Sequence, residues 1–220
     1  LKLWAQQAIP TSKTLSTKTV DAEVTPSFLS ETAELVIEPS EFFSAKASLT
    51  HYNFNNLPSA VALESVIYGN SVDEIGPNTS RFKYRFDGFM ARGELGLKLA
   101  PGFGWMLSGY AIQNMGADEG YRNAQMIQTG FKIGLPGDIE LSPSANTFFI
   151  EDDVVPGFYN SSSLGHNNRQ GFGGALEAFF QRQRFKLRAE YVDAGVINYN
   201  VNQSRQQTLS LSFETFYEML

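Results

Sequence analysis

Residues 172–193 show a regular alternation of apolar and polar positions. Two alternating runs flank the polar tetrapeptide at 181–184, a pattern that predicts a β-hairpin. Folding it about positions 182 and 183 places Glu177 opposite Arg188 and Gly174 opposite Tyr191. One face of this hairpin is then apolar over a full strand length, and the other face carries the charges.

A second hairpin of the same design is predicted near the N-terminus. Residues 32–38 and 43–50 alternate on either side of a break at 39–41. Pairing Ile37 with Phe43 places Glu34 opposite Lys46 on the polar face. The next short turn is expected at 53–58, followed by a strand at 59–68.

Two more hairpins are predicted in the middle of the chain. Residues 91–99 and 105–111 pair across the turn at 101–104, with Leu99 opposite Trp105. Residues 127–133 and 139–149 pair so that Lys132 faces Glu140. Pro143 should disturb the second of these hairpins, because proline cannot donate a backbone hydrogen bond inside a sheet.

The remaining segments are expected to be single strands and loops. Residues 1–9 and the segment from Leu209 to Met219 alternate as strands, and residues 81–99 form a long strand whose apolar phase changes. One extra residue near 88–90 would cause that change, which predicts a β-bulge. Polar stretches at 10–30, 69–80, 114–123, 151–170 and 194–206 predict loops.

Composition narrows the class of protein. The 220 residues include 18 Phe, 9 Tyr, 19 Gly and no Cys, which favours strands and turns and excludes disulfides and thiolate metal sites. The net charge is -6 with acids and bases interleaved, so no basic stripe marks a nucleic-acid surface. No apolar run reaches the length of about 18 residues that a membrane helix needs, whereas barrel strands are short and half apolar. No signal peptide is visible in the sequence, which opens at Leu1 directly with alternating positions, so we expect either a removed export signal or a start within a longer protein.

The lengths of the connections and the placement of aromatic residues point to one architecture. Tight turns near 101, 136 and 182 alternate with long connections, as in an up-and-down outer-membrane barrel. Phe103, Trp105, Phe180 and Phe185 lie beside the tight turns, where such barrels carry an aromatic girdle. Two short turns near 39 and 53 do not fit this alternation, because they would lie at opposite ends of the sheet.

Four segments carry a resemblance to a known class of protein. Residues 93–110, 131–142, 173–191 and 208–219 resemble the bacterial outer-membrane porin-like barrels, and the resemblance covers residues 81–220 best. Such barrels end on an outward aromatic residue. Here Phe213, Tyr217 and Met219 are in phase, but the chain ends one position later at Leu220.

These observations predict an all-β fold, a single domain over residues 1–220. It would be a transmembrane antiparallel up-and-down β-barrel of about ten to twelve strands, complete or part of a larger barrel, in the bacterial outer membrane. The expected function is passive diffusion of small hydrophilic solutes or ions through a charged lumen. The predicted lumen-lining residues are Lys46, Lys83, Arg85, Arg92, Glu94, Lys98, Lys132, Glu140, Glu177, Lys186, Arg188 and Glu190.

The predicted partners are outer-membrane lipid and the solutes themselves, with no nucleic acid, cofactor, metal ligand or catalytic residue. A second copy of the chain or another envelope protein is compatible as a partner. The main alternative is a non-conducting barrel that anchors such a partner. A soluble β-sandwich or calycin-like binding protein would instead turn the apolar face inward.

Two groups of residues in the loop at 151–170 have side chains suited to a chemical site. His166 lies near the serines at 161–163 and downstream of Asp152 and Asp153, which is the minimum for a hydrolase site. Glu151, Asp152 and Asp153 together could hold calcium. Both arrangements also arise in any hydrophilic loop, so we expect the protein not to be an enzyme.

Overall fold

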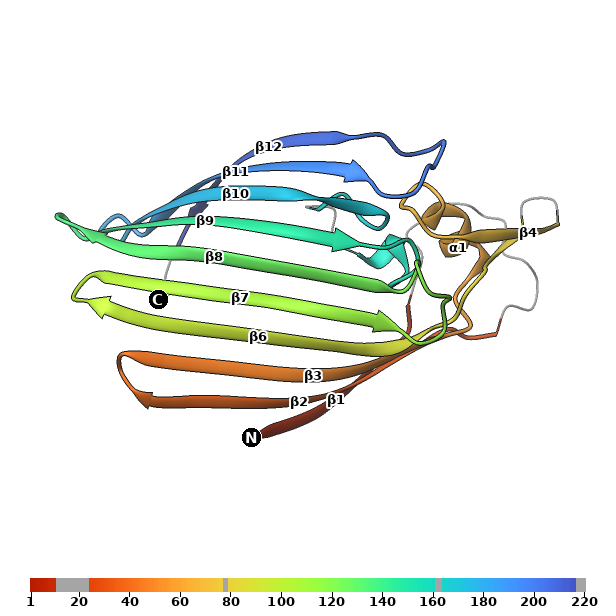
Figure 1. The fold of residues 1–220 in the computed structure, drawn as a ribbon, viewed down its shortest axis with the longest axis horizontal. Coiled ribbons are helices and arrows are strands. Elements are labelled where there is room, and N and C mark those ends of the chain that lie inside the picture. Colours follow the sequence, from red (N-terminus) through yellow and green to blue (C-terminus); the bar gives the residue numbers. More distant parts are fainter. Residues whose placement is uncertain (11–23, 77–78, 161–163, 217–220) are drawn as a thin grey trace.

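The computed structural model describes residues 1–10, 24–76, 79–160 and 164–216. One antiparallel sheet of ten strands dominates it, in the order β1-β2-β3-β6-β7-β8-β9-β10-β11-β12 (Figure 1). The all-β prediction is confirmed. The strands are β1 Lys2–Ala8, β2 Ser27–Ser40, β3 Phe43–Asn55, β6 Phe86–Ala100, β7 Phe103–Asn114, β8 Asn123–Leu135, β9 Ile139–Ile150, β10 Arg169–Phe180, β11 Phe185–Val196 and β12 Gln206–Thr215.

Successive strands of the large sheet are neighbours, with one excursion between β3 and β6. This excursion contains the helix α1 (Ser59–Ser65) and a two-stranded sheet of β4 (Val72–Gly76) and β5 (Thr79–Phe82). A short 3-10 helix, η1 (Gly157–Tyr159), lies between β9 and β10. The up-and-down order therefore holds along the described part of the chain.

Tight turns and long connections lie at opposite ends of the sheet (Figure 1). The turns β2–β3, β6–β7, β8–β9 and β10–β11 share one end, and the connections that follow β3, β7, β9 and β11 share the other. The expected conflict between turns near 39 and 53 disappears, because the chain after β3 makes the long excursion through α1.

The predicted strand at 59–68 is wrong, because residues 59–65 form α1. Val61, Ala62 and Ser65 are the buried residues of this helix, whereas Leu63 and Ile67 are exposed. Burial at positions i, i+1 and i+4 follows one face of a helix rather than the alternate positions of a strand. A short apolar run of this kind fits either period, and tertiary packing decides between them.

The predicted bulge at 88–90 is also wrong. Residues 83–85 are not part of a strand and separate β5 from β6. From Phe86 to Leu97, β6 then pairs with β3 in continuous register. Two features account for the change of apolar phase: β5 belongs to a different sheet, and Phe86 of β6 is buried on the face of the strand opposite to that of Leu95. Lys83 and Arg85 consequently lie in the break, not on a strand.

The hairpin at 172–193 is confirmed in full, with Glu177 opposite Arg188 and Gly174 opposite Tyr191. The other three hairpins form with a register that differs by two residues from the prediction. The observed pairs are Ile37 with Ala45, Leu97 with Trp105, and Gly134 with Glu140.

The shift by two arises at the turns. β2 and β6 run on to Ser40 and Ala100, each with a register irregularity in its last residues. Gly102 (φ +72°) and Gly137 (φ +87°) adopt left-handed conformations that let the chain reverse within two or three residues. Because the shift is even, every side chain stays on its predicted face.

Pro143 lies inside β9, which has neighbours on both sides. The pairing of β9 with β8 runs as far as Gly130–Ser144 and resumes at Ile133–Leu141. Pro143 therefore falls in a gap of the pairing with β8, as its missing backbone donor requires, while the register is the same on both sides of the gap and Pro143 remains opposite Leu176 of β10.

The sheet is curved (Figure 1). Its two faces differ in the side chains that they carry. On the convex face apolar side chains are exposed: Ile127 is 59% exposed, Leu187 44% and Leu211 80%. The charged side chains predicted on the opposite face of the strands line the concave side. The apolar face is thus not packed inside a protein core.

The sheet does not close on itself among the described residues. β1 pairs only with β2, and β12 pairs only with β11, so both are edge strands. Within the same residues, no helix has the length and apolar character needed to cross a membrane.

The loop predicted at 10–30 ends earlier than expected, because β2 begins at Ser27. Residues 11–23 of that prediction lie outside the described residues, and so do Tyr217 and Met219 of the predicted last strand.

Among the residues that the structure describes, the compact core lies at the end of the sheet that carries the long connections. Its buried residues are Ala124, Phe148, Ile150, Val154, Val192 and Ala194. The hydroxyl of Tyr52, on β3, donates to the carbonyl of Val154 at 2.7 Å. The connection between β9 and β10 is thereby held against the concave face, while the tight-turn end stays open.

Candidate functional site

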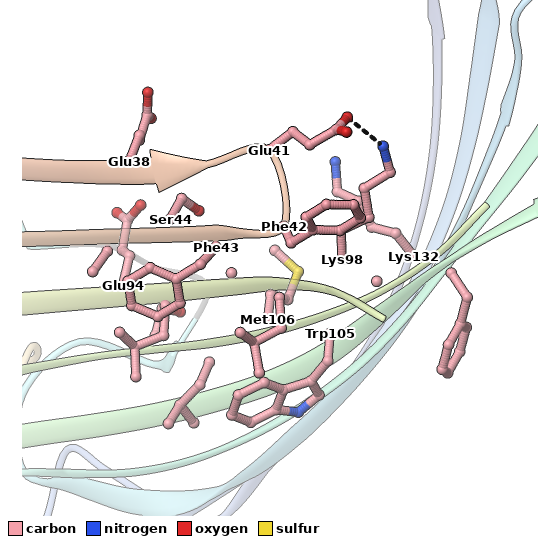
Figure 2. Close-up of a pocket in the computed structure, with 18 of the residues that line it drawn as sticks. Glu38, Glu41, Phe42, Phe43, Ser44, Glu94, Lys98, Trp105, Met106 and Lys132 are labelled. Atoms are coloured by element: carbon pink, nitrogen blue, oxygen red, sulfur yellow. Dashed lines mark hydrogen bonds and ion pairs between the residues drawn. The ribbon is translucent and has the colours of Figure 1, made fainter. Parts of the chain in front are cut away.

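The open end of the concave face forms a groove of about 1070 Å³. Strands β2, β3, β6, β7, β8 and β9 all contribute to its lining, which is why curvature of the sheet is needed to make it. Figure 2 shows Glu41, Lys98 and Lys132 gathered on one side of the strands, with Trp105 on the other. The ring of Phe42 lies 5.9 Å from the Lys98 ammonium and forms part of the same wall.

Basic and acidic side chains are paired along this groove. The distances are short enough for ion pairs, and most of the partners remain partly exposed, so each pair contributes little to stability by itself. The pairs are Lys46–Glu34 at 2.9 Å, Arg92–Glu94 at 2.7 Å, Lys98–Glu41 at 3.3 Å and Lys132–Glu140 at 3.7 Å.

A second charged cluster lies on β10, β11 and β12. Lys186 contacts Glu177 and Glu214, each at 3.6 Å. Arg188 contacts Glu177 at 3.8 Å and Glu190 at 3.2 Å. The charges of this cluster form a network across three strands, so they hold one another in place more firmly than isolated surface pairs would.

The structure places ten of the twelve predicted lumen residues on the concave face. Strand registers connect them, for example Lys46 with Glu94 and Glu177 with Arg188. The other two, Lys83 and Arg85, lie in the break between β5 and β6. Lys83 contacts the ring of Tyr84 at 5.1 Å, and the backbone carbonyl of Arg85 accepts a hydrogen bond from Asn114. The residues on the face are Lys46, Arg92, Glu94, Lys98, Lys132, Glu140, Glu177, Lys186, Arg188 and Glu190.

Small polar residues separate the two charged clusters. Ser108 on β7, Gln128 on β8 and Asn146 on β9 lie side by side in one row across the sheet. Gly173 continues that row on β10, and its bare backbone leaves room for the side chain of Asn146. The middle of the concave face is thus polar, uncharged and not filled by large side chains.

The end with long connections is closed by a network of buried asparagine and aspartate side chains. Asn70 donates to the carbonyls of Asp152 and Val155, and its own oxygen accepts from the Gly157 amide at 2.6 Å. Asn167 donates to the same two carbonyls, at 2.9 and 2.6 Å. The amides replace backbone partners that these irregular segments lack, which accounts for their burial.

The three acids that the sequence suggested as a calcium site do not converge. Glu151 accepts from the Asn123 amide, Asp152 from the Asn198 side chain and Asp153 from the Ser71 amide. Among the described residues, no group of three or more His, Asp or Glu side chains gathers around a common point. These carboxylates connect separate segments of the chain and do not form a metal site.

His166 lies in the same closed end. Its ring packs on Tyr68 with centroids 4.2 Å apart, and Nδ1 lies 3.1 Å from the carbonyl of Gly157. Burial lowers the pKa of His166. The serines at 161–163 lie outside the described residues.

Burial raises the pKa of Asp152 to about 6, against the hydrogen bond from Asn198, which lowers it. Burial also raises the pKa of the neighbouring Asp153. An acid with a raised pKa binds its proton more tightly in the folded state than in the unfolded state. Its contribution therefore stabilises the fold at acidic pH and is lost as the pH rises through about 6.

We predict that Asp152→Asn raises the unfolding free energy at pH 7.5 by about 1–3 kcal/mol, the order expected from this shift. The amide keeps an acceptor for Asn198 and carries no charge to bury. Between pH 5 and pH 7.5 the variant should lose less stability than the unsubstituted protein, with the remaining slope due to Asp153 and, in the opposite sense, His166. Thermal unfolding at the two pH values measures this, and an unchanged difference between them would contradict it.

Two features of the concave face were not predicted from the sequence. Glu41, in the β2–β3 turn, pairs with Lys98 although the two are far apart in the chain. Aromatic side chains also lie on this face near the closed end, among them Phe28, Tyr52 and Phe54. In the sequence these aromatic residues occupy the alternate positions that otherwise carry polar side chains, and this pattern could have predicted that they lie on the concave face. Comparison with protein-family models and with curated proteins found no match for this chain.

Proposed function

We propose that this chain forms the wall of a porin-like β-barrel in an outer membrane and lets small hydrophilic solutes or ions diffuse along its concave face. One observation carries the proposal: an apolar face exposed over the ten-stranded sheet backs onto a face of paired charges. Soluble monomers rarely expose continuous apolar surface of this extent. A lipid-facing exterior and a polar interior account for both faces.

Aromatic side chains at the tight-turn end support the same proposal. Phe103 stacks on Phe131 with centroids 5.7 Å apart, and Phe180 stacks on Phe185 at 4.4 Å. All four lie on the convex face close to the tight turns. An aromatic row at one border of an apolar band is typical of membrane barrels, where it meets the lipid headgroups.

A barrel requires partners for both edges of the sheet. Ten strands in one antiparallel row give nine pairings, so β1 and β12 run in opposite directions. They are therefore suited to antiparallel pairing with each other or with further strands of the same barrel. The proposal needs one of these two arrangements.

The closed end favours a second candidate function, a non-conducting barrel that anchors an envelope partner. The connection between β9 and β10 covers part of the concave face, with Val154 fully buried against it. A cover that extends across a narrow lumen would block it.

Electrical recording distinguishes the two functions. Protein refolded in detergent and checked for heat-modifiable gel mobility is reconstituted into planar lipid bilayers. We expect discrete conductance steps that are proportional to voltage. Folded, inserted protein without steps would favour the anchor, and protein that stays monodisperse without detergent would overturn both candidates.

A further inference from the structure

We propose that both edges of the sheet pair with a second copy of this chain, so that two copies together form the wall of one barrel. β12 of each copy lies antiparallel to β1 of the other, in a head-to-tail contact that a two-fold axis closes into a ring. Two sheets of ten strands give twenty strands, an even number within the range known for outer-membrane barrels. The lumen of the proposed function is incomplete without the second copy.

The edge formed by β12 has the properties of a strand that is paired on both sides. Its ten residues keep a continuous register with β11 and include no proline, and Glu214 is their only charged residue. Free edges are usually protected by a bulge, a proline, several charges or a covering segment. Leu209, Leu211 and Phe213 are instead 72%, 80% and 62% exposed. The backbone groups along this edge therefore fit an added β-strand.

The added strand has to continue both faces of the sheet, and β1 of another copy does so. Leu3 of β1 lies opposite Ala33 on the convex face, and Lys2 lies opposite Glu34 on the concave face. β1 also runs in the direction opposite to β12, because nine antiparallel pairings separate them. The partner strand is thus identified by its direction and by the side on which its apolar residues lie.

Charge complementarity selects one register for this contact. Lys2 is the only charged residue of β1, and placing it opposite Glu214 pairs all seven residues of β1 with residues 208–214. Leu3 then faces Phe213 on the convex face. A slip by one residue would put apolar side chains on the concave face, and a slip by two would separate the two charges.

The edges of a single chain are held apart at the closed end. Tyr52 of β3 donates to the carbonyl of Val154, which shares a core with Val192 of β11. The side chain of Gln203, in the β11–β12 connection, donates to the carbonyl of Asn167 at 3.2 Å. The β9–β10 connection therefore fixes the curvature from β3 to β12, and Figure 1 shows β1 and β12 at opposite borders of the sheet. Pairing within one chain would require the sheet to curl further and expel this connection, whereas a second copy leaves it in place.

Disulfide cross-linking tests the contact and its register. The chain has no cysteine, so an introduced pair reports this contact alone. Gln6 and Ser210 lie opposite each other in the proposed register, and Gln6→Cys with Ser210→Cys brings two thiols within reach of a disulfide. Oxidation of protein folded in detergent should shift most of it to twice the apparent mass on a non-reducing gel, and a reductant should reverse the shift. Lys2→Glu, which places two acids opposite each other, should slow the cross-link several-fold.

The matched control moves the second cysteine to an inner strand. Ser142 lies on the concave side of β9, opposite Glu177, and Gln6→Cys with Ser142→Cys should give no dimer. Sedimentation equilibrium of the unsubstituted protein in density-matched detergent should give two chains per particle, and this measurement does not depend on the folding of any variant. A disulfide within one chain, one chain per particle, or equal cross-linking of the two cysteine pairs would overturn the proposal.

This inference rests on the proposed function in one respect, because the second copy completes the same lumen. Neither experiment needs a membrane or conduction. Covalent dimers without conductance steps would support the pairing of copies and contradict the pore. Conductance steps from protein with one chain per particle would overturn the pairing alone.

Discussion

An arginine in place of Leu95 is expected to destabilise the folded protein by about 2–4 kcal/mol in lipid vesicles, the cost measured for a base on the lipid face at mid-depth. Leu95 lies midway along β6 on the convex face, between Ala45 and Leu107, and is 40% exposed. Where lipid covers this face, a guanidinium at position 95 loses its water and finds no acidic neighbour. Urea titration of the vesicle-bound protein gives the change in unfolding free energy.

Gln128→Arg is the matched control. Gln128 lies on the concave face of β8, between Ser108 and Asn146. An arginine there meets water and polar neighbours, so we expect a change below about 1 kcal/mol. Equal effects of the two substitutions, or a Leu95→Arg protein that becomes soluble without detergent, would show that water and not lipid contacts the convex face.

Asn70→Ala is expected to cost about 2–4 kcal/mol of local stability at the closed end. Asn70 is 4% exposed and joins the excursion between β3 and β6 to the β9–β10 connection through its hydrogen bonds to Asp152, Val155 and Gly157. Alanine leaves the Gly157 amide without this acceptor. Asn167 still donates to the carbonyls of Asp152 and Val155, which keeps the loss below a simple sum of lost bonds.

Native-state hydrogen exchange measures this effect at a single site. Protection of the Gly157 amide should fall by a factor of about 30 to 1000, the equivalent of that free energy. The control is Asn55→Ala, since Asn55 is exposed and its side chain bonds only to that of Asn53 in the described structure. Unchanged protection in Asn70→Ala would show that the amide network does not hold the connection in place.

The substitutions at the two ends of the sheet are expected to act through different physical effects. At the tight-turn end the strands are joined by a few residues and the concave groove stays open, so substitutions there act on charge and on the surrounding medium. At the other end the long connections pack on Tyr52 and Phe148, and substitutions act on a core.

The hairpin at 172–193 was predictable to the residue because its turn carries four polar positions between two uninterrupted alternating runs. The hairpin at 91–111 was predicted with a register error of two. Nothing in its local pattern distinguishes Leu97 from Leu99 as the partner of Trp105, since both are apolar and lie on the same face. Turn geometry at Gly102 made that choice.

For the candidate site, the sequence predicted which face of the sheet carries the charged residues, but not which of them pair with one another. Alternation alone placed ten charged residues on one side of the sheet, but the pairing of Lys98 with Glu41 depends on how two turns come together. The strand predicted at 59–68 and the strand position of Lys83 and Arg85 were wrong for a related reason. The pattern of a short apolar or aromatic run does not determine whether the run forms a strand, or which sheet that strand joins.

The sequence by itself determined that the chain is all-β, that its strands are ordered up and down, and that each strand has an apolar and a charged face. These properties follow from a two-residue period and from turn residues, which are local. Only the tertiary structure decided the register, the curvature that turns a charged face into a groove, and the closed end built on Asn70 and Asn167. Each of these depends on contacts between residues far apart in the chain, and a local pattern contains no information about them.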